Sequence, residues 1–134
     1  MIDMAVTLSP ATRDLVDGRN YAVLATLNPD GSPQTSVVWV TRDGDDLLFS
    51  TLLDRAKERN LRRDPRASAS IWSSADPEVY AEVRGTVTIT EDTGRELVDA
   101  LAHKYVGRDF PPDGPGKVRV VLRLTPTRVT GNAA

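Results

Sequence analysis

Residues 50–66 read STLLDRAKERNLRRDPR, and the rest of the chain is arranged around this segment. An apolar strand, Leu47–Phe49, ends where the segment begins, and the pattern after it predicts a short helix. Asp54 has the side chain of a typical N-cap residue. Asp64 precedes Pro65, and a residue before proline is disfavoured in the α region, so we expect the helix to end there.

The charges of this predicted helix are unusual at its beginning. Arg55 and Lys57 fall in the first turn, where the helix dipole favours carboxylates over cations. Backbone N–H groups and two cations together can hold an anion such as phosphate, and Ser50 and Thr51 would add hydroxyl donors. The alternative is a solvated basic face made of the cations of the segment, which are Arg55, Lys57, Arg59, Arg62, Arg63 and Arg66.

The composition is that of an ordinary globular domain. The chain has 134 residues, of which 40% are hydrophobic and 27% charged, and its net charge is −2. We expect one domain over residues 1–134, with loosely ordered ends at 1–8 and 131–134. The charge balance does not favour nucleic-acid binding, and the low aromatic content, 5%, offers few stacking residues.

Several kinds of site are excluded or disfavoured by the residue types present. The sequence has no cysteine, which excludes disulfides and thiol catalysis, and its single histidine, His103, argues against a histidine metal site or a Ser-His-Asp triad. It shows no signal-peptide pattern and no apolar run that could span a bilayer. We therefore expect no metal and no membrane partner, and a cytoplasmic location.

The remaining segments predict a mainly β protein with flanking helices. Strands joined by tight turns form antiparallel sheets, and six strands in this length predict a small closed or split barrel. Gly85, in the middle of a long alternating segment, predicts a bulge or bend. The predicted strands are residues 21–27, 32–41, 46–51, 66–72, 79–90 and 118–129, and the predicted helices are residues 9–18, 54–64 and a third that begins with a capping box at 93–96.

Two predicted segments have more than one interpretation. Gln34, Thr35 and Ser36 place polar side chains on both faces of the second strand, which is typical of a wet pocket or of an exposed strand end. Residues 107–116 hold three prolines and three glycines, so they form a loop that either covers a site or only connects two elements.

Three segments resemble a known family over most of the chain: residues 21–27, 30–34 and 55–66. The last, placed after a strand that ends in Ser50 and Thr51, is the most specific. The chain resembles the pyridoxamine 5′-phosphate oxidase-like split-barrel family, also called the FMN-binding split barrel. More narrowly, it is similar to the coenzyme F420-dependent oxidoreductases. This resemblance implies a six-stranded antiparallel split β-barrel that forms a homodimer, with cofactor sites at the subunit interface.

The resemblance also implies the cofactor and its contacts. The expected cofactor is coenzyme F420, a deazaflavin, with FMN as the alternative. Arg55 and Lys57 would contact the cofactor phosphate, with Ser50, Thr51 and Ala56 at the same end and Asn60 close by. Pro33, Gln34, Thr35 and Ser36 would run beside the ring, and the strand of residues 37–40, Val38 included, would give backbone contacts. The partner subunit would supply residues near Trp72 and from Val79 and Tyr80. The other arginines of segment 50–66 would meet the polyglutamate tail of the coenzyme or solvent.

The expected activity is hydride transfer between reduced deazaflavin and a small unsaturated or quinone-like acceptor. No catalytic residue is indicated, and Tyr80 and His103 are the only titratable candidates. The sequence stops at Ala134 without the basic, histidine-containing extension of the pyridoxamine phosphate oxidases, so oxidation of pyridoxamine phosphate is not expected. The alternatives are an FMN-dependent oxidoreductase of the same fold and a flavin- or deazaflavin-binding protein without turnover.

Overall fold

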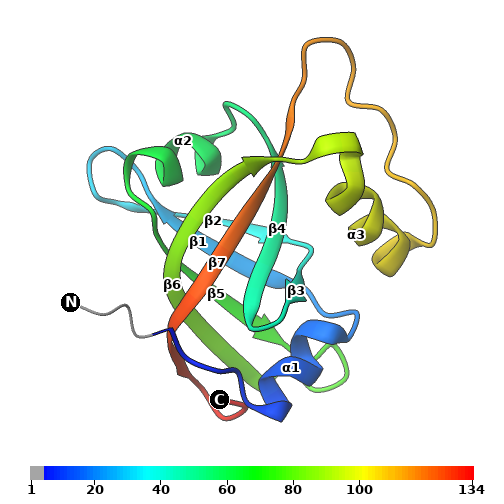
Figure 1. Ribbon diagram of the computed structural model, residues 1–134. Helices are drawn as coiled ribbons and strands as arrows, with labels where there is room; N and C mark the ends of the chain where they lie inside the picture. Colours follow the sequence, from blue (N-terminus) through cyan, green and yellow to red (C-terminus); the bar gives the residue numbers. More distant parts are fainter. Residues whose placement is uncertain (1–4) are drawn as a thin grey trace.

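The computed structural model describes residues 5–134 as one antiparallel sheet with three helices around it (Figure 1). The strands lie in the order β2-β1-β5-β6-β7-β4-β3. This confirms the predicted mainly β split barrel, but with seven strands in place of six. The elements are α1 Pro10–Asp17, β1 Ala22–Leu27, β2 Pro33–Val38, β3 Thr41–Asp43, β4 Asp46–Leu52, α2 Ala56–Arg63, β5 Arg66–Trp72, β6 Tyr80–Glu91, a 3₁₀ turn Thr93–Arg95, α3 Glu96–Val106 and β7 Arg119–Thr130.

The seventh strand arises because the predicted strand 32–41 is broken at Val40. The Val40 N–H donates to Tyr105 Oη at 3.2 Å, and its carbonyl accepts from Lys104 Nζ at 2.6 Å. These bonds to α3 remove Val40 from the β1–β2 ladder. The chain then continues as β3, which pairs with the first half of β4 through a turn at Gly44, where φ is 61°.

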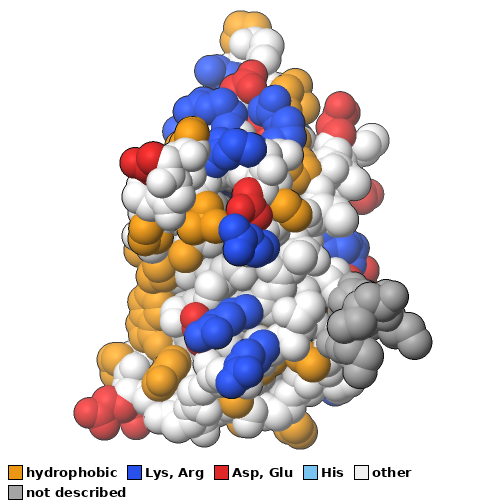
Figure 2. All heavy atoms as spheres, turned by 90° about the vertical axis from the view of Figure 1, so that its left-hand side faces the viewer, with side chains coloured by type: hydrophobic (Ala, Val, Ile, Leu, Met, Phe, Trp, Pro, Cys, Tyr) orange, Lys and Arg blue, Asp and Glu red, His pale blue; other side chains and the backbone are white. Residues whose placement is uncertain are grey.

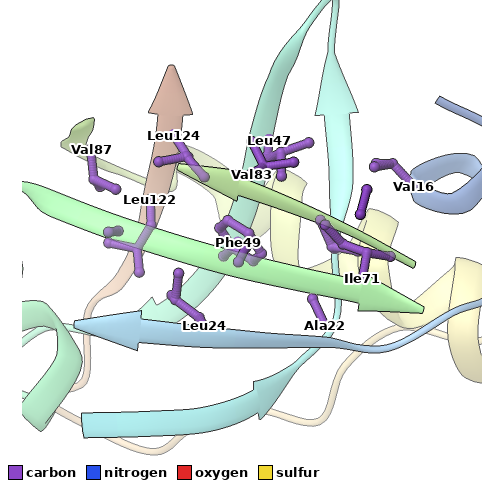
Figure 3. Close-up of a cluster of buried hydrophobic side chains, with 14 of the residues drawn as sticks. Val16, Ala22, Leu24, Leu47, Phe49, Ile71, Val83, Val87, Leu122 and Leu124 are labelled. Carbon is purple, nitrogen blue, oxygen red and sulfur yellow. The ribbon is translucent and has the colours of Figure 1, made fainter. Parts of the chain in front are cut away.

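The interior is filled by the alternating apolar residues of the strands, which point toward one another between the strands in Figure 3. Leu24, Phe49, Leu122 and Leu124 are fully buried. Removing such side chains from water is the dominant favourable term in folding. The strands that carry the candidate site are therefore held by a continuous core.

The predicted irregularity at Gly85 is confirmed. The β6–β7 register shifts between Arg84 and Gly85, so the long strand bends there. A Cβ atom on Gly85 would lie 2.0 Å from the Thr125 carbonyl oxygen, which only glycine avoids.

Several residues of the two chain ends contact the rest of the molecule, while the expectation of loosely ordered ends stays a prediction. Leu8 and Ala133 are buried, and the Val6 N–H donates to the Pro126 carbonyl at 2.9 Å. Thr12 Oγ1 donates to the Ala133 carbonyl at 2.7 Å, which ties α1 to the C-terminal turn. The expectation for residues 1–4 lies outside the described residues.

The ends of two helices are built differently from common capping motifs. Gly18 follows α1 with φ of −70°, so that helix ends without a left-handed residue. The capping box predicted for residues 93–96 does not form. Asp92 replaces it: its carboxylate accepts from the N–H groups of Leu97 and Val98 at 2.9 and 3.0 Å. Within residues 5–134, the helices are too short or too polar to cross a membrane.

Candidate functional site

The main candidate site is a pocket at the seam of the sheet, between β2 and the second half of β4. β2 is an end strand, and β3 covers only Asp46–Leu48 of β4, so ladder hydrogen bonds between β2 and β4 are absent from the described residues. The pocket has a volume of about 330 Å³. Its walls are Tyr21, Val37, Val38, Trp39, Ser50, Thr51, Leu52, Arg55, Lys57, Val98, Leu101, Phe110 and Arg119.

One end of this pocket is cationic. Arg55, Lys57 and Arg119 line it together with the hydroxyls of Ser50 and Thr51, and the described lining residues include neither aspartate nor glutamate. Burial and the neighbouring charges of Arg55 and Arg119 lower the pKa of Lys57 below its usual value. Because an anion would relieve this repulsion and supply acceptors for every donor, the cationic end is suited to a phosphate group.

The start of α2 is shaped by a buried carboxylate. Asp54 was predicted to be the N-cap, but Arg55 occupies that position, because Asp54 turns the chain with a left-handed φ of 71°. Glu58 is 1% exposed, and its Oε1 accepts from the Asp54 N–H at 2.8 Å. Arg62 pairs with both Glu58 and Asp54. This network fixes the turn from which Arg55 and Lys57 reach the pocket.

Arg119 is a site residue that the sequence did not indicate. It lies opposite Leu52 in the β4–β7 ladder, and its Nη1 lies 3.4 Å from Ser50 Oγ. Asp113 binds the other side of the guanidinium with two contacts of 2.8 Å, and this ion pair lowers the pKa of the carboxyl to about 2. Arg119 therefore presents its remaining N–H groups toward the cationic end.

The opposite end of the pocket is apolar and aromatic. The ring of Tyr105 stacks between Tyr21 and Trp39, at centroid distances of 5.7 and 5.2 Å. Phe110 meets Trp39 edge to face at 6.0 Å. Val98 and Leu101 of α3 close this end, so a flat apolar group would contact aromatic rings or aliphatic side chains around it.

Comparison with known proteins decides the family. Residues 8–133 match the family described as pyridoxamine 5′-phosphate oxidase. The chain belongs to this family. A solved structure described as an F420 reductase is 31% identical, with a TM-score of 0.83, and the match covers 92% of this chain and 98% of that one.

Two more distant structures share the fold of the family. A conserved hypothetical protein from Mycobacterium tuberculosis is 22% identical, with a TM-score of 0.73 and coverage of 96% of this chain and 86% of that one. A pyridoxamine 5′-phosphate oxidase-related, FMN-binding protein from Nostoc punctiforme is 20% identical, with a TM-score of 0.63 and coverage of 92% and 84%.

The pocket brings together five of the residues that the family resemblance assigned to the cofactor, namely Val38, Ser50, Thr51, Arg55 and Lys57. Four others, Pro33, Gln34, Thr35 and Ser36, lie on β2 just before the lining residues Val37 and Val38. The hydroxyl of Ser36 is buried and has no hydrogen-bond partner among residues 5–134. Ala56 begins α2 between two lining residues but does not line the pocket itself.

Three further residues expected near the cofactor lie outside the pocket lining of this family member, and two of them, Trp72 and Tyr80, were expected from the partner subunit. Asn60 is 4% exposed and donates to Thr26 Oγ1 at 3.0 Å and to Asn28 Oδ1 at 3.1 Å, so it fastens α2 to the β1–β2 turn. Trp72 and Tyr80 face each other across β5 and β6 and do not line the pocket of their own chain. The histidine candidate, His103, is exposed and pairs with Asp109 at 2.6 Å.

The other arginines of segment 50–66 are engaged with their own chain. Arg59 donates to the Asp54 carbonyl, Arg63 donates to the Leu27 carbonyl, and Arg66 pairs with Asp64 at 2.8 Å. Lys and Arg side chains gather toward the top of the face shown in Figure 2, which is the side of the molecule on which α2 lies in Figure 1. These internal contacts favour the interpretation of this face as a structural and solvated surface over a tail-binding one.

Proposed function

We propose that this pocket binds the phosphate-bearing part of a flavin-type cofactor, with coenzyme F420 as the first candidate and FMN as the second. The observation that carries the proposal is the composition of the cationic end. Three cations and two hydroxyls converge there without a carboxylate among the described lining residues. The 31% identical F420 reductase supports the deazaflavin in particular.

The residues present fit such a group along the whole pocket. Arg55, Lys57 and Arg119 would hold the phosphate, and Ser50 and Thr51 would donate hydroxyl hydrogen bonds to it. The uncovered backbone of the end strand β2 offers polar contacts for the edge of a ring. The aromatic end would shield the ring from water.

When bound, a deazaflavin or flavin supplies a ring position that accepts or gives a hydride. We propose that the chain is an oxidoreductase that uses this chemistry on a small unsaturated or quinone-like acceptor. In this proposal, the side chains of the pocket bind the cofactor, orient it toward the acceptor and exclude water. Holding the two reacting groups in a productive geometry lowers the barrier to hydride transfer.

We also propose that the active form is a homodimer. Val37, which lines the pocket from the end strand β2, is 65% exposed, and Tyr80, which lies outside the pocket, is 41% exposed. Exposed apolar side chains of this size are candidates for an interface with another chain. A second copy would cover these side chains and bring Trp72 and Tyr80 to the other subunit's pocket. Sedimentation at micromolar concentration would test this, and a monomer that still binds the cofactor fully would contradict it.

A second candidate is a protein that binds the cofactor without turnover. The observation that favours it is the lack of an acidic or histidine side chain among the described lining residues, since these are the usual proton donors. Saturable cofactor binding combined with no reduction of any acceptor in a broad panel would support this candidate over the enzyme.

The test of the cofactor site is a fluorescence titration with oxidised coenzyme F420 and, separately, with FMN. Each of Arg55→Ala and Lys57→Ala removes a charge-assisted contact of about 1.5–3 kcal/mol, so we expect affinity to fall by about tenfold or more. Arg128→Ala, an exposed arginine of β7 away from the pocket, is the matched control. If Arg55→Ala and Lys57→Ala both bind the cofactor as tightly as the wild type and the control variant do, the anion site is elsewhere.

A further inference from the structure

The loop between α3 and β7 sends one aromatic side chain into the pocket. In the segment 107–112 of this loop, every residue is exposed except Phe110, whose ring lines the apolar end. Figure 1 shows the rest of the loop standing away from the sheet beside α3. Phe110 is therefore a wall residue supplied by a segment that contributes little else to the core.

The backbone of Phe110 is fixed on both sides by charged side chains. Its N–H donates to Asp99 Oδ1 at 3.0 Å, and its carbonyl accepts from Arg95 Nη2 at 3.0 Å. Arg95 also binds the Pro111 carbonyl and pairs with Asp113 at 2.6 Å. The loop is thus attached to α3 and to the turn before it at the position where Phe110 enters.

The ring of Phe110 also touches both ends of the pocket. It packs against Trp39 in a T-shaped arrangement at the aromatic end, and the guanidinium carbon of Arg119 lies 4.7 Å from its centroid. Arg119 reaches Ser50 on its other side, so one side chain connects the loop with the cationic end. Asp113, a residue of the same loop whose side chain is 11% exposed, pairs with both Arg119 and Arg95.

We propose that Phe110 is the specificity-determining residue of this pocket, which sets the size of the flat apolar group that is accepted beyond the bound phosphate. The inference rests on the proposed anion site and adds the selection of the second group. Its geometric basis is that Phe110 is the wall residue that comes from the loop, whereas the others belong to strands, to helices or to the segments directly beside them. Changing its volume alters the pocket without removing a residue of the main core cluster.

The test uses aryl phosphates of rising size, phenyl phosphate and 2-naphthyl phosphate, with inorganic phosphate as the reference for the cationic end. Calorimetry would give Kd for the wild type, Phe110→Ala and Phe110→Trp. We expect Phe110→Ala to favour the naphthyl over the phenyl compound by about tenfold more than the wild type does, and Phe110→Trp to shift the ratio in the opposite direction. Val106→Ala, an exposed apolar residue outside the pocket, should leave the ratio unchanged.

The outcomes separate this inference from the proposed function. If the wild type binds the aryl phosphates but both Phe110 variants keep its ratio, Phe110 does not select the ligand and the inference is wrong while the anion site stands. If neither inorganic nor aryl phosphate binds to the wild type, the anion site itself fails, and the inference fails with it. Opposite shifts with a constant Kd for inorganic phosphate would establish the role of Phe110.

Discussion

Asp54 and Arg95 have left-handed backbone conformations, with φ of 71° and 60°. Such conformations cost a residue with a side chain roughly 1–3 kcal/mol and persist only where the surroundings hold them. Each of these residues stands directly before a helix that contributes to the pocket, Asp54 before the region of Arg55 and α2, and Arg95 before α3. The unfavourable backbone geometry is therefore concentrated at the two helix starts that shape the site.

Asp54 gives a direct test of this backbone effect. Asp54→Gly removes the left-handed penalty but also loses the exposed pair with Arg62, so we expect a free energy of unfolding within about 1 kcal/mol of the wild type. Asp54→Val keeps φ positive with a β-branched side chain and should lose at least about 2 kcal/mol. Urea denaturation would measure both. Equal losses would mean that the side-chain contacts of Asp54, and not its φ, determine its contribution.

The individual site residues were predictable from sequence only where the signal is local. Arg55 and Lys57 follow a strand end within a few positions, and both line the pocket. Arg119 lies more than sixty positions away, and only the pairing of Leu52 with Arg119 brings it there. The hydrogen bonds of Asn60 to Thr26 and Asn28 were not predictable, because no local pattern shows that its side chain turns toward the hairpin.

At the scale of elements, α2 is held in place mainly by polar contacts. An isolated helix of eight residues is unstable in water, and Leu61 is its one buried apolar residue. The buried side chains of Glu58 and Asn60 hydrogen-bond to the turn before the helix and to the β1–β2 turn. The position of the cationic end therefore depends on hydrogen bonds, which fix direction more closely than apolar packing.

The long hairpin β6–β7 gives a prediction at the same scale. Gly85→Ala would place a Cβ 2.0 Å from the Thr125 carbonyl oxygen, so the bulge must open or the strands must separate. We expect a loss of at least about 2 kcal/mol, within the range for overpacked sites, measured as a lower midpoint of thermal or urea unfolding. Thr88→Ala, at an exposed position of the same strand, is the control. A Gly85→Ala protein as stable as that control would contradict the bulge geometry.

The strands were predictable because alternation and turn residues are short-range properties of the sequence. The predicted long strands of residues 79–90 and 118–129 differ from β6 and β7 by one residue at each end, which is within the usual uncertainty of such boundaries. The break that separates β2 from β3 was missed because it depends on Tyr105 and Lys104, side chains of a distant helix that take the backbone groups of Val40 out of the ladder.

Across the whole molecule, Lys104 joins three elements at one ammonium group. Its Nζ donates to the carbonyls of Val16 at the end of α1 and Val40 between β2 and β3, and it lies 5.1 Å from the Tyr105 ring. Burial lowers the pKa of Lys104 to about 8, although the nearby Asp17 partly opposes this. Keeping the Lys104 ammonium group charged at neutral pH therefore lowers the free energy of unfolding.

The consequence is a specific dependence of stability on pH. Above about pH 8 the folded state loses the Lys104 proton, while the unfolded state keeps it up to its ordinary pKa of about 10.5. Because the unfolded state then binds more protons, this group makes the free energy of unfolding rise with pH between about 8 and 10.5. Urea unfolding across this window should show that rise in the wild type relative to Lys104→Met. Parallel curves for the two proteins would contradict the lowered pKa.

The open seam has a mechanical consequence for the molecule. A barrel closed by a full ladder has its diameter fixed by hydrogen bonds, but here the strands on either side of the pocket are not bonded to each other, so side chains alone set the width of the gap. A molecule that contacts the strands on both sides of the gap therefore connects them and makes this part of the barrel wall more rigid. Binding of a ligand in the pocket and a loss of mobility at the gap between β2 and β4 are then expected to occur together.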